Sequence, residues 1–119
     1  APFLLTQFLI PALLKSDDAR ILFLSSSVGR EARAYWGAYS VSKFGIEGFA
    51  KTLSEELEKT KISVNTVNPG KLRTEMRRTA YPAEDSSTVP LPEHKSSAIV
   101  YLLSSMSPKM NGEQLTIAD

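Results

Sequence analysis

The sequence of 119 residues predicts an α/β protein that forms one half of a doubly wound parallel sheet. Two observations support this prediction. Amphipathic helical stretches alternate with short, continuously apolar runs, which are typical of strands covered on both faces. The longest amphipathic stretch lies directly between two such runs, which is the order of a βαβ unit. The length suits one modest domain, so residues 1–119 are assigned to a single partial domain.

The first four elements follow from periodicity and composition. Residues 1–15 form a helix, because leucines and phenylalanines recur at helical spacing. Residues 21–24 are a buried strand without alternation. Residues 37–60 form a long helix whose apolar stripe consists of Ile46, Phe49, Ala50, Leu53 and Leu57. Residues 62–67 are a second strand rich in β-branched side chains, which ends at Pro69-Gly70.

Residues 71–92 are the least regular part of the chain. Prolines at 82, 90 and 92 predict a loop over residues 71–92, with one short helix at 74–80. A third long helix follows over residues 93–105, with a proline at its first turn. A turn and a last short strand lie within residues 111–119. The complete predicted order is therefore α-β-α-β-α-β.

Composition excludes several classes of function. A net charge of +1 gives no electrostatic basis for binding nucleic acid or an anionic membrane surface. The absence of cysteine excludes thiolate metal sites and disulfides, and it is compatible with the cytoplasm, where we expect the protein. The apolar run at the N-terminus is too short to span a bilayer. Because the chain opens in mid-helix without a methionine, we expect it to be a fragment.

Tyr39 and Lys43 are four residues apart on the predicted long helix, so their side chains share one face at neighbouring turns. A free tyrosine titrates near pH 10, but a cation within about 4–6 Å lowers that pKa toward the operating pH. Ser26 follows the first strand and Pro69-Gly70 the second, so both border the crevice beyond the carboxyl ends of the strands. Each feature alone is common, since a serine-rich loop is usually only a loop. Their convergence predicts a site.

These segments, FLSSSVG, YSVSK and VNTVNPGKLRT, together resemble the short-chain dehydrogenase/reductase family. Tyr39 stands thirteen positions after Ser26, and Asn-Pro-Gly-x-x-x-Thr follows downstream. The resemblance covers essentially the whole chain, as the C-terminal part of a longer Rossmann-like protein. It implies that the glycine-rich dinucleotide turn and the active-site asparagine of the family precede Ala1. The segments SSSVGREARAYWGAYSVSKF and YPAED are most similar to a bacterial branch of the family.

The resemblance also implies a role for each matching residue. Tyr39 would be the acid/base, Ser26 would hold the reacting oxygen, and Lys43 would tune Tyr39 and bind the nicotinamide ribose. Ser25 and Ser27 flank Ser26, and only the spacing selects among the three. The cofactor-binding residues would be Tyr39, Lys43, Pro69, Gly70, Leu72 and Thr74. The cofactor would be NAD or NADP, with a slight preference for NADP, and no metal ligands are expected.

The predicted function is hydride transfer between a nicotinamide cofactor and a small alcohol or carbonyl substrate. Two alternatives stay open: an epimerase or dehydratase relative that uses the same Tyr-x-x-x-Lys pair, and a non-catalytic fragment that keeps only the fold and its association surfaces. The Asn-Pro-Gly-x-x-x-Thr pattern favours the dehydrogenase. The resemblance further implies a homodimer or homotetramer through helices 1–15 and 37–60, with Phe49 as an outward apolar position.

Several other residues are given ordinary structural roles. His94 is the only histidine and is predicted to lie at the surface of a helix start. Arg73, Arg77 and Arg78 could contact a phosphate, but exposed charge is the default interpretation. Trp36 could line the mouth of the substrate site, although packing against the long helix is favoured.

Overall fold

The computed structural model describes residues 1–118 and confirms the predicted alternation of helices and strands. The strands are β1 (Ala19–Leu24), β2 (Ile62–Asn68) and β3 (Gln114–Thr116). The longer helices are α1 (Pro2–Leu13), α2 (Gly37–Glu56) and α4 (Glu93–Leu103). The loops hold the short helix α3 (Glu75–Ala80) and the single 3-10 turns η1 (Ser27–Gly29) and η2 (Ser86–Thr88). Asp119, at the end of the segment predicted to contain the last strand, lies outside the described residues.

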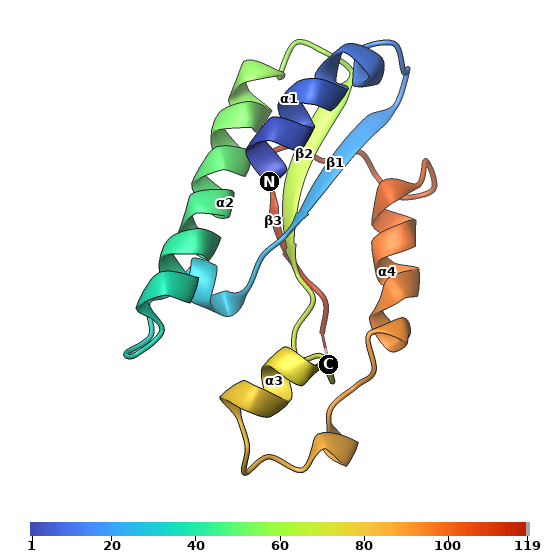
Figure 1. The fold of residues 1–119 in the computed structure, drawn as a ribbon. Coiled ribbons are helices and arrows are strands. Elements are labelled where there is room, and N and C mark those ends of the chain that lie inside the picture. The colour runs from blue at the N-terminus through green and yellow to red at the C-terminus, as the bar shows by residue number, and fades with distance from the viewer. Residues whose placement is uncertain (119) are drawn as a thin grey trace.

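The three strands form a parallel sheet in the order β1-β2-β3. β1 and β2 pair from Ala19 opposite Ile62 to Leu24 opposite Val67, whereas β3 pairs with β2 over three residues only. Because parallel strands end at the same edge of a sheet, the loops that follow β1 and β2 emerge close together (Figure 1). The fold therefore positions the serine-rich turn beside the Pro-Gly turn.

Helices cover both faces of the sheet. Figure 1 shows α1 and α2 on one side of the strands and α4 on the other. Between α2 and the sheet lies a core of buried side chains, and β2 is buried along almost its whole length because both of its faces are covered. The core consists of Ala19, Ala50, Leu53, Leu57, Ile62 and Val64. Burial of this apolar area is the main source of stability in the fold.

Two sequence predictions about α2 need correction. The helix ends at Glu56 rather than at Thr60, because the Thr60 hydroxyl donates to the Leu57 carbonyl and accepts from the Ile62 N–H, which builds a turn into β2. Phe49 is not an outward position. Its ring packs between those of Phe3 and Phe23, with distances of 5.2 and 5.5 Å between ring centroids, and the residue is only partly exposed.

α1 displays a broad apolar surface. Phe3, Leu4, Leu5 and Phe8 each expose more than half of their side-chain surface, up to 81% for Phe8. Surfaces of this kind are typical of interfaces with another part of a protein or with a partner. Within residues 1–118, no helix combines the length and the apolarity needed to cross a membrane.

Candidate active site

The turn after β1 holds the candidate serine. The Ser25 N–H donates to the Val67 carbonyl at 2.8 Å, which extends the sheet ladder by one residue. Ser26 then caps η1, since its backbone is extended and its Oγ accepts from the Val28 N–H at 3.3 Å. The Ser40 hydroxyl of α2 donates to the Val28 carbonyl at 3.2 Å and ties the turn to the helix. The Ser26 hydroxyl is thus fixed in place, and its own proton is left to donate.

Gly29 lets the serine turn approach α2 closely. A Cβ atom at this position would lie 2.8 Å from the Cβ of Lys43 and 2.9 Å from both the Lys43 carbonyl oxygen and the Ser25 Oγ. Two of these three atoms belong to backbone or to the stiff base of a side chain on a long helix, so they cannot move away without shifting the helix. The absence of a side chain at Gly29 therefore lets the serine turn lie directly against α2 at Lys43.

Replacing Gly29 with alanine should push the serine turn away from α2. We expect the free energy of unfolding to fall by about 1–3 kcal/mol through overpacking, and activity to fall further because a displacement of about 1 Å can cost about 10²-fold. Urea denaturation and steady-state rates measure the two effects. Gly37→Ala is the matched control, because a Cβ there meets no atom within 4 Å. An active and fully stable Gly29→Ala protein would contradict this account.

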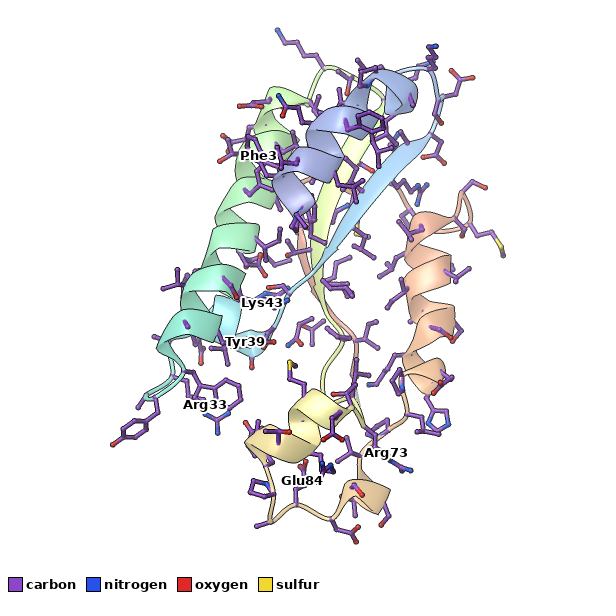
Figure 2. All side chains as sticks on the ribbon, viewed as in Figure 1. Phe3, Arg33, Tyr39, Lys43, Arg73 and Glu84 are labelled. Atoms are coloured by element: carbon purple, nitrogen blue, oxygen red, sulfur yellow. The ribbon has the colours of Figure 1, made fainter. Side chains whose placement is uncertain are left out.

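Tyr39 and Lys43 both lie in the N-terminal part of α2. The Lys43 Nζ lies 5.7 Å from the centroid of the Tyr39 ring, and it donates to the Leu24 carbonyl at 3.2 Å. This hydrogen bond reaches the last residue of β1, so the ammonium is anchored at the carboxyl end of that strand. Figure 2 shows the two side chains on the side of α2 that faces this strand end. The helical spacing and the sheet together bring the cation near the phenol.

The turn after β2 lies across from the serine turn and α2 at the same edge of the sheet. The Asn68 Oδ1 accepts from the Gly70 N–H at 3.0 Å, and Gly70 has a φ of 75°, a left-handed conformation that favours glycine. Farther along, the Thr74 hydroxyl accepts from the Arg77 N–H at 3.2 Å and caps α3. These contacts turn the chain back across the strand ends and hold α3 over the site.

A cleft of about 610 Å³ opens between these elements. It brings together most of the residues that the sequence predicted for the site, namely Ser26, Tyr39, Pro69, Gly70, Leu72 and Thr74. Of the predicted residues, Lys43 alone does not border the cleft, and its ammonium is held on the Leu24 carbonyl. Ser25 and Ser27, which flank Ser26, also reach the cleft wall. All three serines line the cleft, so only the spacing in the sequence selects Ser26 among them.

The cleft suits the nicotinamide end of a dinucleotide. Its volume lies within the range of about 300–1,000 Å³ that is usual for cofactor and small-molecule pockets. The Pro69-Gly70 turn carries little side-chain bulk, so a flat ring could approach the backbone there, and Thr74 keeps its hydroxyl proton free to donate. The residues present thus fit such a cofactor. Within residues 1–118, no group of three or more His, Cys, Asp or Glu could hold a metal.

An aromatic and cationic cluster lies at the rim of the cleft, and of its members the sequence pointed only to Trp36, as a residue that could line the mouth of the site. Trp36 packs edge-on against Tyr39 at 5.6 Å, and it also lies 5.8 Å from Tyr81 of the loop after α3. The Arg33 guanidinium lies 5.4 Å from the Trp36 ring. Trp36 therefore lines the cleft as well as packing on the helix. The aromatic side chain of Trp36 at the start of α2 is the only signal in the sequence that pointed here.

The arginines of the loop after β2 hold its shape. Arg73 donates to the carbonyls of Ser87 and Val89, so it is more than an exposed charge. Arg77 forms a two-pronged ion pair with Glu84, at 2.8 and 2.9 Å, and this hydrogen bonding lowers the pKa of the Glu84 carboxyl. Arg78 pairs with a glutamate on the exposed side of α3, and His94 is exposed on α4, as expected for surface residues.

Glu47 joins the site to the sheet and was also not predicted. It is 7% exposed, and its carboxylate accepts from the Arg30 Nε at 2.9 Å, the Thr66 Oγ1 at 2.8 Å and the Gln114 Nε2 at 3.0 Å. Burial alone would raise the pKa of Glu47, but the hydrogen bonds outweigh it and the pKa is lowered. The signal in the sequence was an acidic residue within the apolar stripe of α2, one turn after Lys43.

Comparison with known proteins supports the resemblance seen in the sequence. The model of the short chain dehydrogenase family matches residues 1–85. The chain is 44% identical over 112 residues to the uncharacterized oxidoreductase YciK of Escherichia coli (strain K12), an alignment that covers 94% of this chain and 44% of YciK. This agrees with the bacterial branch that the sequence segments indicated. The chain spans about half the length, or less, of the relatives that it matches.

Solved structures give the same result. A short chain dehydrogenase from Pseudomonas syringae superimposes with a TM-score of 0.91 at 48% identity, covering 97% of this chain and 47% of that protein. A short chain dehydrogenase from Shigella flexneri 2a, solved in complex with NADP, gives a TM-score of 0.91 at 42% identity, over 97% of this chain and 48% of that one. The fold, the matched family model and these relatives agree, and the chain belongs to the short-chain dehydrogenase/reductase family of Rossmann-like oxidoreductases.

Proposed function

We propose that this chain forms the catalytic part of an NAD(P)-dependent oxidoreductase that interconverts a carbonyl compound and an alcohol. One observation carries the proposal: Tyr39 and Ser26, from separate elements, line one cleft, and the Lys43 ammonium lies 5.7 Å from the Tyr39 ring. Because the chain spans less than half of YciK, the activity is proposed for the complete protein that contains it.

Each residue has a distinct role in the proposed reduction. The cofactor, when bound, supplies a hydride to the carbonyl carbon. Tyr39 gives its phenolic proton to the carbonyl oxygen as that oxygen gains electron density, and the alcohol results. The Ser26 hydroxyl, whose oxygen accepts from Val28, donates its proton in a hydrogen bond to the same oxygen. Lys43 keeps two donors beyond the Leu24 carbonyl for the ribose hydroxyls, and its charge stabilises the tyrosinate left behind.

The cofactor proposed for this site is NADP. The support comes from relatives: proteins 42% identical to this chain were solved with NADP and with NADPH. The contacts on this side would come from Tyr39, Lys43, Pro69, Gly70, Leu72 and Thr74. All of them except Lys43 border the cleft, and the Lys43 ammonium is held on the Leu24 carbonyl. Here the chain presents the ribose and nicotinamide side of the cofactor site.

The proposal is tested by supplying the complete protein with NADPH and a panel of aldehydes and ketones. An oxidoreductase consumes one NADPH for each alcohol formed. An epimerase or dehydratase relative would convert its substrate with no net change in nicotinamide, and that outcome would favour the first alternative. A folded protein that binds NADPH and converts no member of the panel would favour the non-catalytic alternative.

We also propose that copies associate through α1 and α2. Support comes from the exposed apolar side chains of both helices, including Val41 of α2, which is 74% exposed. Val41→Asp should convert the oligomer of the complete protein into monomers, because a carboxylate at an apolar interface loses its hydration without gaining a partner. Sedimentation velocity measures the change. Lys59→Asp, on the exposed turn after α2, is the control, and an unchanged oligomer for Val41→Asp would reject this interface.

A further inference from the structure

Arg33 is held at the rim of the cleft by two aromatic rings. Its guanidinium carbon lies 5.4 Å from the centroid of Trp36 and 5.7 Å from that of Tyr81, and its Nη1 donates to the Tyr81 hydroxyl at 2.6 Å. The guanidinium is therefore held by two cation–π contacts and by one hydrogen bond. An arginine has five N–H donors, so most of its donors remain for a ligand.

The charges that line the cleft do not balance. Its charged residues are Arg33, Lys71, Arg77 and Glu84. Glu84 accepts two hydrogen bonds from Arg77, so the charges of these two residues neutralise each other. Within residues 1–118, neither Arg33 nor Lys71 has a carboxylate at ion-pair distance. A cleft with surplus positive charge attracts an anion. Of the two cations without a carboxylate partner, Arg33 is the one whose side chain is held in a fixed position.

Arg33 lies on the far side of Tyr39 from Lys43. Trp36 stands one helical turn before Tyr39 and packs edge-on against it, whereas Lys43 stands one turn after it. Figure 2 shows Lys43, Tyr39 and Arg33 following one another toward the end of α2 at which the helix begins. If Lys43 marks the cofactor side of the reacting oxygen, Arg33 marks the opposite side, where the rest of the substrate extends.

We propose that Arg33 binds a negatively charged group on the carbonyl substrate, with the Trp36 and Tyr81 rings forming the walls of that subsite. The proposal rests on the proposed function, because it takes Tyr39 as the point at which the carbonyl is bound. It narrows the substrate class to carbonyl compounds that carry an anion beyond the reacting carbon. A guanidinium in a fixed plane suits a carboxylate through paired hydrogen bonds.

The test compares two aldehydes of similar shape, para-formylbenzoate and its methyl ester, of which only the first is negatively charged, with the complete protein and NADPH. We expect kcat/KM to be higher for the carboxylate. Arg33→Leu should lower kcat/KM for the carboxylate by about 10-fold more than for the ester, mainly through KM, since a hydrogen bond to a charged group is lost. Arg33→Lys should restore part of the preference. Arg78→Leu, which removes an arginine outside the cleft, is the control.

A binding measurement separates this inference from the proposed function. Calorimetric titration of the protein–NADP⁺ complex with both aldehydes reports affinity without turnover. If the protein binds the carboxylate more tightly than the ester, this preference depends on Arg33 and neither aldehyde is turned over, the anion subsite is supported and the oxidoreductase function is rejected. Turnover of both aldehydes with no preference, or an equal loss of both in Arg33→Leu, rejects the subsite alone. A weaker affinity of Arg33→Leu for NADPH itself would show that the anion is a cofactor phosphate and would overturn the proposal.

Discussion

Tyr39→Phe in the complete enzyme should lower kcat by about 10²–10⁴-fold while the fold and the binding of NADPH stay largely intact. The substitution removes one hydroxyl group and the proton that it would give to the substrate oxygen. The ring itself remains, so its edge-on contact with Trp36 at 5.6 Å and its place near Lys43 are kept. Steady-state rates of NADPH oxidation, together with calorimetric titration of NADPH, measure the two quantities separately.

The control for this substitution is Tyr35→Phe. Tyr35 lies four residues earlier in the chain and is fully exposed, and it does not border the cleft. Loss of its hydroxyl should leave kcat unchanged. A Tyr39→Phe enzyme that kept most of its activity would remove Tyr39 from the proposed chemistry. If both variants kept their activity, the proton would come from another group, and the Ser26 hydroxyl would be the next candidate to test.

The elements of the fold were predictable because local patterns determine them. The unbroken apolar run at residues 21–24 and the β-branched run at 62–67 indicated strands covered on both faces, and these strands pair in parallel. The stripe on α2 was predictable for the same reason. The end of α2 was not, because the Thr60 turn replaces the last helical turn through side-chain hydrogen bonds that carry no periodicity.

The residues of the candidate site were predictable where local patterns place them: Tyr39 and Lys43 share one helical face, and others follow the end of a strand. Ser26 and Pro69-Gly70 could be placed at one crevice, since parallel strands end at the same edge. Tyr81 and Arg33 could not, because their contact at 2.6 Å depends on how the loop after α3 folds back over 48 residues of sequence separation. Phe49 was misplaced because a helical stripe does not show where its edge meets α1.

Glu47 shows best how a site is supported from outside the cleft. Its carboxylate joins α2 to Arg30 after η1, to Thr66 of β2 and to Gln114 of β3. Arg30 in turn donates to the Leu115 carbonyl at 2.9 Å, so the network also fixes the short third strand. Because Glu47 follows Lys43 by one helical turn, the same contacts hold the helix segment that carries Lys43 against the sheet.

Glu47→Gln should therefore lower the free energy of unfolding at neutral pH by about 3 kcal/mol, because it leaves Arg30 without its carboxylate. The lowered pKa of Glu47 means that its ionised form stabilises the fold above the pKa of the unfolded chain, and that this contribution disappears as the pH falls through the pKa of the folded protein. Urea denaturation between neutral pH and about pH 3 should therefore show that the free energies of unfolding of the two proteins approach each other as the pH falls.

The control is Glu55→Gln, which changes an exposed carboxylate on the same helix. Its free energy of unfolding should stay within about 0.5 kcal/mol of the parent throughout. A constant gap between the Glu47→Gln and parent curves down to low pH would show that Glu47 acts through packing rather than charge.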